Sequence, residues 1–191
     1  MILVFIRHGE SRANLLERES AGFLCGRWDC DLTPAGREQA AALRGCGAVS
    51  GADAIFCSPL KRAMETAAAF ADREVLYDDR ITERTLGDFD GKWRTELEGL
   101  EGYRKYFTDP RFLEFRHSFT VAAPHGENYT DVVRRVAPFL REILGRDYRK
   151  AVIVSHSEAI KCMIKVAKGL SEEETLKIRI RHCEPVEVEC P

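Results

Sequence analysis

The chain has 191 residues, of which 45% are hydrophobic and 31% are charged, so its length and composition fit one domain with a single core. Its 29 lysines and arginines are balanced by 31 aspartates and glutamates, which gives a net charge of −2. This balance excludes a strongly basic surface for nucleic acid or for an anionic membrane. We therefore expect neither partner, and an anionic ligand would be held by individually placed arginines.

Neither the N-terminus nor the cysteines indicate an extracellular protein. The apolar run 1–6 ends at Arg7 and His8, which makes it far too short for a signal peptide or a membrane span. The seven cysteines form no C-x-x-C pair, as expected of reduced core residues in a cytoplasmic protein. The spacing of His182, Cys183 and Cys190 matches no zinc motif, so we expect no metal there.

The first half of the chain alternates short apolar runs with helical stretches. Residues 2–6 are continuously apolar, which is typical of a strand covered on both faces. Thr33 is a suitable N-cap and Pro34 a suitable first residue for a helix. In chain order we predict a strand over 2–6, a helix over 35–44, a strand over 53–57, a helix over 60–71 and a strand over 74–77.

The segment 93–119 interrupts this alternation with aromatic residues among arginines. We interpret the region of about 93–126 as a small helical cap over one end of the sheet. Its aromatic residues form either the core of the cap or a lid that lines a substrate pocket. Its basic residues either bind a second anionic group of a substrate or form a solvated face. Beyond it we predict a helix over 127–144, a strand over 151–155, a helix over 158–168, an edge strand over 176–181 and a further strand over 186–189.

Alternating strands and helices predict an α/β fold, with a mostly parallel central sheet between two layers of helices in a three-layer sandwich. No linker or repeat divides the sequence, so we expect a single domain over 1–191 that includes the cap insertion.

Chemically active side chains follow the predicted strands. Arg7 and His8 come directly after the first strand, Arg62 follows the second, Glu83 follows the third and His156 ends the fourth. The carboxyl ends of parallel strands meet at one edge of a sheet, where ligands gather. These side chains therefore predict a site in which a histidine lies beside groups that bind an anion. The amide of Asn14 is one of those groups.

The same residues fall in motifs that resemble the histidine phosphatase superfamily, the family of cofactor-dependent phosphoglycerate mutases. The segment 7–11 resembles the signature R-H-G-x-[ST], and Asn14 falls where the family has a phosphate-contacting asparagine. The segment 31–40 resembles D-x-x-L-T-x-x-G-x-x-Q-A, one residue tighter at its start. The segment 58–63 resembles S-x-x-x-R-A, which contributes Arg62. The resemblance covers nearly the whole chain.

The later motifs continue in the family's order. Glu83, followed by glycines at 87 and 91, matches E-x-x-x-G-x-x-x-G, and the segment 126–128 is similar to the G-E-S that begins the long helix. His156 stands where the family has its second histidine. Arg84 fits the E-R pattern of the mutases. Ser157 departs from the family, which usually has glycine after the second histidine.

The resemblance implies that His8 is the nucleophile and that a phosphohistidine forms on it. Arg7, Arg62 and His156, with Asn14, are implied to hold the nonbridging oxygens, and no metal or cofactor is implied. Glu83 is the implied proton donor, although four other acids lie nearby: Asp78, Asp79, Asp88 and Asp90.

Three further expectations concern binding. Ser157 can present its N–H to phosphate only if its φ is not positive. Arg84 is a substrate-binding candidate, and His117 and His125 are expected to be surface or cap residues.

We therefore expect a metal-independent phosphatase that hydrolyses a phosphomonoester of a small metabolite. The alternatives are a cofactor-dependent phosphoglycerate mutase and an inactive binding or scaffold protein. The expected partner is the phosphorylated metabolite itself, and a homodimer is left open.

Overall fold

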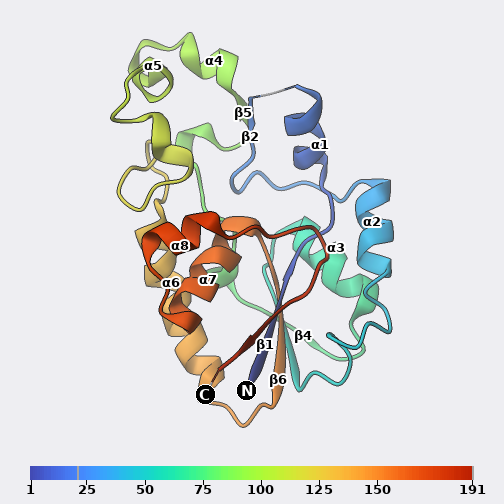
Figure 1. The fold of residues 1–191 in the computed structure, drawn as a ribbon. Coiled ribbons are helices and arrows are strands. Elements are labelled where there is room, and N and C mark those ends of the chain that lie inside the picture. Colours follow the sequence, from blue (N-terminus) through green and yellow to red (C-terminus); the bar gives the residue numbers. More distant parts are fainter. Residues whose placement is uncertain (21, 191) are drawn as a thin grey trace.

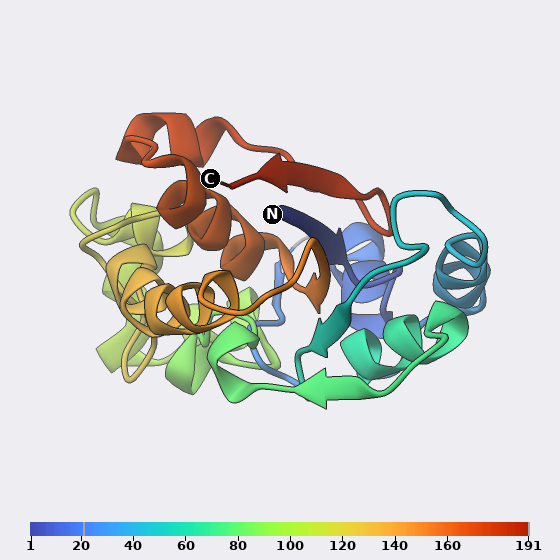
Figure 2. The same cartoon turned by 90° about the horizontal axis from the view of Figure 1, so that it is seen from below.

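A five-stranded sheet in the order β4-β3-β6-β1-β7 forms the centre of the molecule (Figure 2). The computed structural model describes residues 1–20 and 22–190, so positions 21 and 191 of the predicted domain lie outside the described residues. Four strands are parallel, and β7 runs antiparallel to β1. The strands are β1 (Ile2–Arg7), β3 (Ala54–Cys57), β4 (Val75–Tyr77), β6 (Lys150–Ser155) and β7 (Val186–Glu189).

Helices cover both faces of this sheet (Figure 1). One face packs against α6 (Tyr129–Leu144) and α7 (Ser157–Lys168). The other face packs against α3 (Lys61–Phe70), and α2 (Pro34–Ala41) packs against α3. Successive side chains of a strand point to opposite faces. In β1, accordingly, Leu3 and Phe5 belong to the first core while Val4 and Ile6 belong to the second, and all four are 0% exposed. Burying each contributes about 1.5–3 kcal/mol. The predicted α/β class and mostly parallel sheet are confirmed.

Several helix boundaries follow from local capping. The Oγ1 of Thr33 accepts a hydrogen bond from the N–H of Gly36, and Pro34 begins α2, as expected. Asn128 caps α6 together with Asp131, so this helix begins two residues later than the predicted 127. Gly169 ends α7 with φ +65°, a conformation that costs glycine little.

The inserted segment forms a helical cap with its own core (Figure 1). It contains α4 (Arg94–Glu98), α5 (Glu101–Thr108) and the 3-10 helix η3 (Leu113–Arg116), and it adjoins a two-stranded sheet of β2 (Phe23–Leu24) and β5 (Lys92–Trp93). The ring of Phe89, from the 3-10 helix η2 (Gly87–Phe89), contacts four of the aromatic side chains: Tyr103, Tyr106, Phe107 and Phe115. The aromatic cluster is therefore chiefly the core of the cap.

Two elements differ from the sequence-based expectation. The predicted edge strand over 176–181 is wrong, because a helix α8 (Glu172–Lys177) occupies its start and no strand follows it before β7. Ser171 caps α8 and three glutamates occupy its first turn, which favours a helix at that end. A helix α1 (Arg12–Glu19), capped by Ser11, was not predicted. Within 1–20 and 22–190, no helix is long and apolar enough to cross a membrane.

Candidate active site

A cleft of about 310 Å³ opens between the carboxyl ends of the central strands and the cap. Seven of the eight predicted site residues line it: Arg7, His8, Asn14, Arg62, Glu83, Arg84 and Ser157. The eighth, His156, is fully buried directly behind His8, with the two ring centroids 5.1 Å apart. The fold thus brings together residues that lie up to 150 positions apart in the sequence, from Arg7 to Ser157.

The ring of His8 is fixed as a nucleophile would need to be. Its Nδ1–H donates to the carbonyl oxygen of Gly9 at 2.7 Å, which leaves the lone pair on Nε2. Burial, Arg62 and Arg7 hold the pKa of His8 well below its ordinary value, so the ring is neutral near neutral pH.

The loop that carries His8 is tied to its neighbours through the backbone. The N–H of His8 donates to Ser155 at 3.0 Å, and the N–H of Gly9 donates to the Oγ1 of Thr66 at 3.0 Å. Gly9 and Gly36 pack so closely that a Cβ on Gly9 would lie 2.3 Å from the Gly36 carbonyl oxygen. Only glycine fits where these two backbone segments pack together. This close packing fixes the position of the His8 imidazole.

Two buried nitrogen atoms beside His8 have no hydrogen-bond partner among the described residues, the Nε of Arg7 and the Nδ1 of His156. The hydroxyl of Ser58 lies 2.7 Å from the Nε2 of His156 and accepts from the N–H of Leu60. If it donates its own proton to Nε2, the proton of His156 is on Nδ1. Both nitrogens are then unsatisfied N–H donors, and buried donors are normally paired. An anion bound at His8 would satisfy them.

Arg62 supplies a second fixed cation. Its side chain is only 1% exposed, and its guanidinium donates to the carbonyl oxygens of Trp28 at 2.9 Å and Gly26 at 3.0 Å. These bonds hold it against the cleft without neutralising its charge. Arg62 and Arg7 together give the cleft a positive charge that favours binding of a phosphate group.

Glu83 is a buried acid that lines the cleft. Its Oε1 accepts from the backbone N–H of Arg84 at 2.7 Å and of Ala159 at 3.3 Å, and its Oε2 accepts from the N–H of Glu158 at 3.3 Å. Burial and the nearby charge of Glu158 raise the pKa of Glu83. A carboxyl group with a raised pKa is suited to donate a proton.

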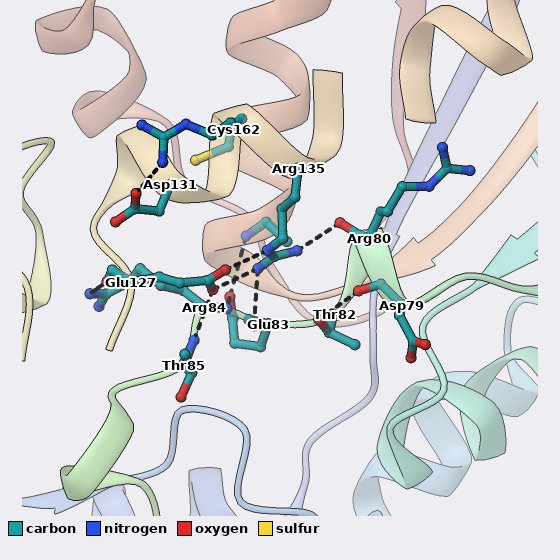
Figure 3. A network of polar contacts seen from close by, with 12 residues as sticks. Asp79, Arg80, Thr82, Glu83, Arg84, Thr85, Glu127, Asp131, Arg135 and Cys162 are labelled. Carbon is teal, nitrogen blue, oxygen red and sulfur yellow. Dashed lines mark hydrogen bonds and ion pairs between the residues drawn. The ribbon is translucent and has the colours of Figure 1, made fainter. Parts of the chain in front are cut away.

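The backbone of Glu83 is held by a network around Arg135 of α6 (Figure 3). The guanidinium of Arg135 donates to the carbonyl oxygens of Arg80 at 2.7 Å and Glu83 at 3.1 Å, and to both carboxylate oxygens of Glu127. Arg27 donates to the same Glu83 carbonyl at 2.7 Å and to Glu127 at 3.1 Å. Glu83 therefore reaches the cleft from a fixed segment of backbone.

The four alternative acids lie elsewhere. Asp78 is bonded to Arg80, Asp90 to Thr85 and Leu86, and Asp88 to Tyr103 and His125, and none of them lines the cleft. Asp79 does not line it either. Among the acids considered from the sequence, Glu83 alone borders the cleft.

The three predicted binding residues have different surroundings. Ser157 is the first residue of α7 and is not among the described residues with positive φ, so its backbone meets the condition for binding phosphate. The Oδ1 of Asn14 accepts from the N–H and the hydroxyl of Ser11, so its amide nitrogen is the group free to face a ligand. Arg84 donates instead to three backbone carbonyls, those of Phe115, Arg116 and Glu127.

The comparison with known families decides the assignment. The family model for the histidine phosphatase superfamily (branch 1) matches residues 3–191. The chain belongs to this superfamily. A 2,3-bisphosphoglycerate-dependent phosphoglycerate mutase from Methylobacterium sp. is 31% identical over 183 residues, covering 90% of this chain and 83% of the relative.

Solved structures place this histidine phosphatase among phosphatases as well. The α-ribazole phosphatase from Shigella flexneri superposes with a TM-score of 0.82 at 25% identity, covering 99% of this chain and 90% of that one. A phosphoserine phosphatase mutant from Entamoeba histolytica, in complex with phosphoserine, superposes with a TM-score of 0.74 at 26% identity, covering 97% and 89%. The expected superfamily is confirmed.

Four residues that line this histidine phosphatase's cleft were not among the predicted site residues: Glu17, Glu158, Arg116, which was considered only as one of the basic cap residues, and His117, which was expected at the surface or in the cap. Glu158 lies two residues after His156, and this proximity in the sequence was a signal that could have identified it as a cleft residue. The other three depend on how α1 and the cap meet, which no local pattern reveals. No cluster of three or more histidines, cysteines or acids suited to a metal occurs in the part of the chain that the structure describes.

Proposed function

We propose that this chain is a phosphatase that hydrolyses the phosphomonoester of a small metabolite through a phosphohistidine on His8. The observation that carries this proposal is a neutral His8 whose sequence neighbour Arg7 and packed neighbour His156 each have a buried nitrogen, Nε and Nδ1, without a hydrogen-bond partner among the described residues. A phosphoryl group at Nε2 of His8 would satisfy both.

The reaction would proceed in two transfers. Nε2 of His8 attacks phosphorus while the P–O bond to the alcohol breaks, and Glu83 protonates the departing oxygen. Glu83 then takes a proton from a water molecule that attacks the phosphohistidine, which releases phosphate and restores His8. Arg7 and Arg62 stabilise the charge on the nonbridging oxygens throughout.

A mutase is the second candidate, because a curated mutase is 31% identical to this chain. A mutase must hold the carboxylate of phosphoglycerate with dedicated cations. Here both terminal nitrogens of Arg84 donate to backbone carbonyls and only its Nε has no partner among the described residues, and Arg116 lies 2.6 Å from Glu17. The other cap cations, Arg94, Arg104, Lys105 and Arg111, do not line the cleft. These contacts favour hydrolysis.

The test is to incubate the enzyme with 3-phosphoglycerate and a catalytic amount of 2,3-bisphosphoglycerate, and separately with p-nitrophenyl phosphate. Our proposal predicts free phosphate from the aryl ester and little 2-phosphoglycerate. Rapid formation of 2-phosphoglycerate without free phosphate would identify a mutase. No turnover of any ester would indicate a binding or scaffold protein.

A further inference from the structure

The segment between α8 and β7 lies against the catalytic end of β1. The antiparallel ladder between β1 and β7 stops at Phe5, two residues before Arg7. Beyond that point an isolated bridge joins Arg7 to His182 in parallel. On this side of the strand, Arg7 and His8 are therefore supported by residues 180–183.

Three hydrogen bonds join residues 180–183 to the pair of Arg7 and His8. The Nη1 of Arg7 donates to the carbonyl oxygen of Ile180 at 3.0 Å, and the N–H of Cys183 donates to the carbonyl oxygen of Arg7 at 2.9 Å. The Nδ1 of His182 lies 2.7 Å from the carbonyl oxygen of His8. Of the three, only this last bond is made by a side chain of the 180–183 segment.

The protonation of His182 follows from its surroundings. Burial and the charge of Arg7 lower the pKa of His182 to about 4, so its ring is neutral near neutral pH and carries one N–H. A carbonyl oxygen can only accept, so that N–H is on Nδ1 and donates to His8. His8 is only 4% exposed, and a buried backbone carbonyl without a partner would be costly.

The backbone after His182 has a conformation that residues other than glycine seldom adopt. Cys183 has φ +53°, and among the described non-glycine residues only His125 also has a positive φ. Such a conformation persists when the surrounding structure fixes it, and it is frequent at functional sites. Around this turn, the ring of His182 and the N–H of Cys183 bond to successive carbonyl groups at the end of β1.

His182 contacts the nucleophile without lining the cleft. Its ring centroid lies 5.5 Å from that of His8. The side chain borders instead a neighbouring pocket, which shares Arg7 and Ser157 with the cleft. His182 can therefore influence the reaction through the position of His8, and not through contact with the substrate.

We propose that His182 is a positioning residue for the nucleophile, because its Nδ1–H holds the carbonyl of His8 and so keeps Nε2 of His8 aligned for attack on phosphorus. The inference rests on the proposed phosphatase function, since it assigns a role in the first transfer. The His8 ring bonds to the next carbonyl, that of Gly9, so a shift of this backbone would move the ring. A displacement of about 1 Å can cost about 10²-fold in rate.

The experiment replaces His182 with three side chains that differ in where they offer an N–H. The amide nitrogen of asparagine occupies nearly the place of Nδ1, that of glutamine lies nearer to Nε2, and leucine has no donor. Phosphoenzyme formation is followed in single turnovers with p-nitrophenyl phosphate and with an alkyl phosphate. We expect His182→Asn to stay within about threefold of the wild-type rate. His182→Gln and His182→Leu should lose about tenfold or more, with little change in substrate affinity.

The two esters separate this role from that of Glu83. The position of the nucleophile affects attack on every ester, so both rates should fall by the same factor, whereas loss of the proton donor spares the aryl ester. The control is His125→Gln, because His125 is 85% exposed and pairs with Asp88 outside the cleft. It should leave both rates unchanged. Urea denaturation shows which variants are folded, and the contrast between asparagine and glutamine is sufficient if His182→Leu does not fold.

NMR of the imidazole nitrogens tests the contact independently of activity. At neutral pH the wild-type His182 should be the Nδ1–H tautomer, and the Nε2–H tautomer would overturn the proposal. Wild-type rates in folded His182→Gln and His182→Leu would also overturn it, as would equal losses in all three variants or losses confined to the alkyl ester. A wild type that leaves p-nitrophenyl phosphate intact would instead refute the proposed function, and the tautomer would still test the contact.

Discussion

The carboxylate of Glu83 accepts a hydrogen bond from the backbone N–H of Glu158 at 3.3 Å, at the N-terminus of α7. The proposed proton donor therefore lies at the first turn of the helix that carries a second carboxylate, that of Glu158. Burial and that neighbouring charge favour the protonated form of Glu83, while burial and two arginines favour the neutral form of His8.

These two shifts predict a bell-shaped pH profile in which the acid limb lies below pH 6.5 and the alkaline limb lies above pH 4.5. The pKa of His8 lies well below the ordinary 6.5, so kcat/KM should fall only when the pH drops through that lowered pKa. The pKa of Glu83 lies above the ordinary 4.5, and activity should fall as the pH rises through the raised pKa. A profile of kcat/KM measured from acid to alkaline pH tests this. An acid limb at or above pH 6.5 would contradict it.

Glu83→Gln should discriminate between leaving groups. An alkyl phosphate needs a proton on its departing oxygen, so its kcat should fall by about 10²–10⁴-fold. The p-nitrophenolate ion leaves readily, so its ester should lose far less. Asp88→Asn is the matched control, because Asp88 bonds to Tyr103 and His125 outside the cleft. Equal losses for both esters would assign the proton donor to another residue.

Arg135→Lys should weaken catalysis through the position of Glu83. Lysine cannot reproduce the bonds of Arg135 to Arg80, Glu83 and Glu127 (Figure 3). We expect kcat for an alkyl phosphate to fall about tenfold or more with little change in KM, and p-nitrophenyl phosphate to be less affected. Arg134→Lys is the control, since Arg134 is 75% exposed and pairs with Asp131. Equal effects of the two variants would refute the positioning role.

Gly36→Ala should destabilise the fold at the base of the site. A Cβ at Gly36 would lie 2.0 Å from the carbonyl oxygen of Glu10, so the His8 loop must shift. We expect the free energy of unfolding to fall by about 1–3 kcal/mol, with a loss of activity. Urea denaturation measures this. Gly47→Ala, where a Cβ meets nothing within 4 Å, should change stability little. A stable, active Gly36→Ala would show that the close packing is not needed.

The sheet and the cluster of side chains at its edge could be predicted from the sequence, because local apolar patterns locate the strands and the family motifs lie at the strand ends. Buried parallel strands such as 2–6 are continuously apolar, and their carboxyl ends meet at one edge. Long-range contacts were not accessible in this way. Arg84 matches the mutase E-R pattern, yet its guanidinium binds the carbonyl of Phe115, 31 residues away. The strand expected over 176–181 does not form, because Ser171 caps a helix that extends to Lys177 and so takes up the start of the alternating segment.

The most direct test of the account is to trap the phosphoenzyme. After rapid quenching with substrate, wild-type protein should carry phosphate that is labile in acid and stable in base, as expected of phosphohistidine. Folded His8→Ala should carry none and should not turn over. Substantial hydrolysis by folded His8→Ala, or a wild-type adduct that is stable in acid, would contradict nucleophilic attack by His8.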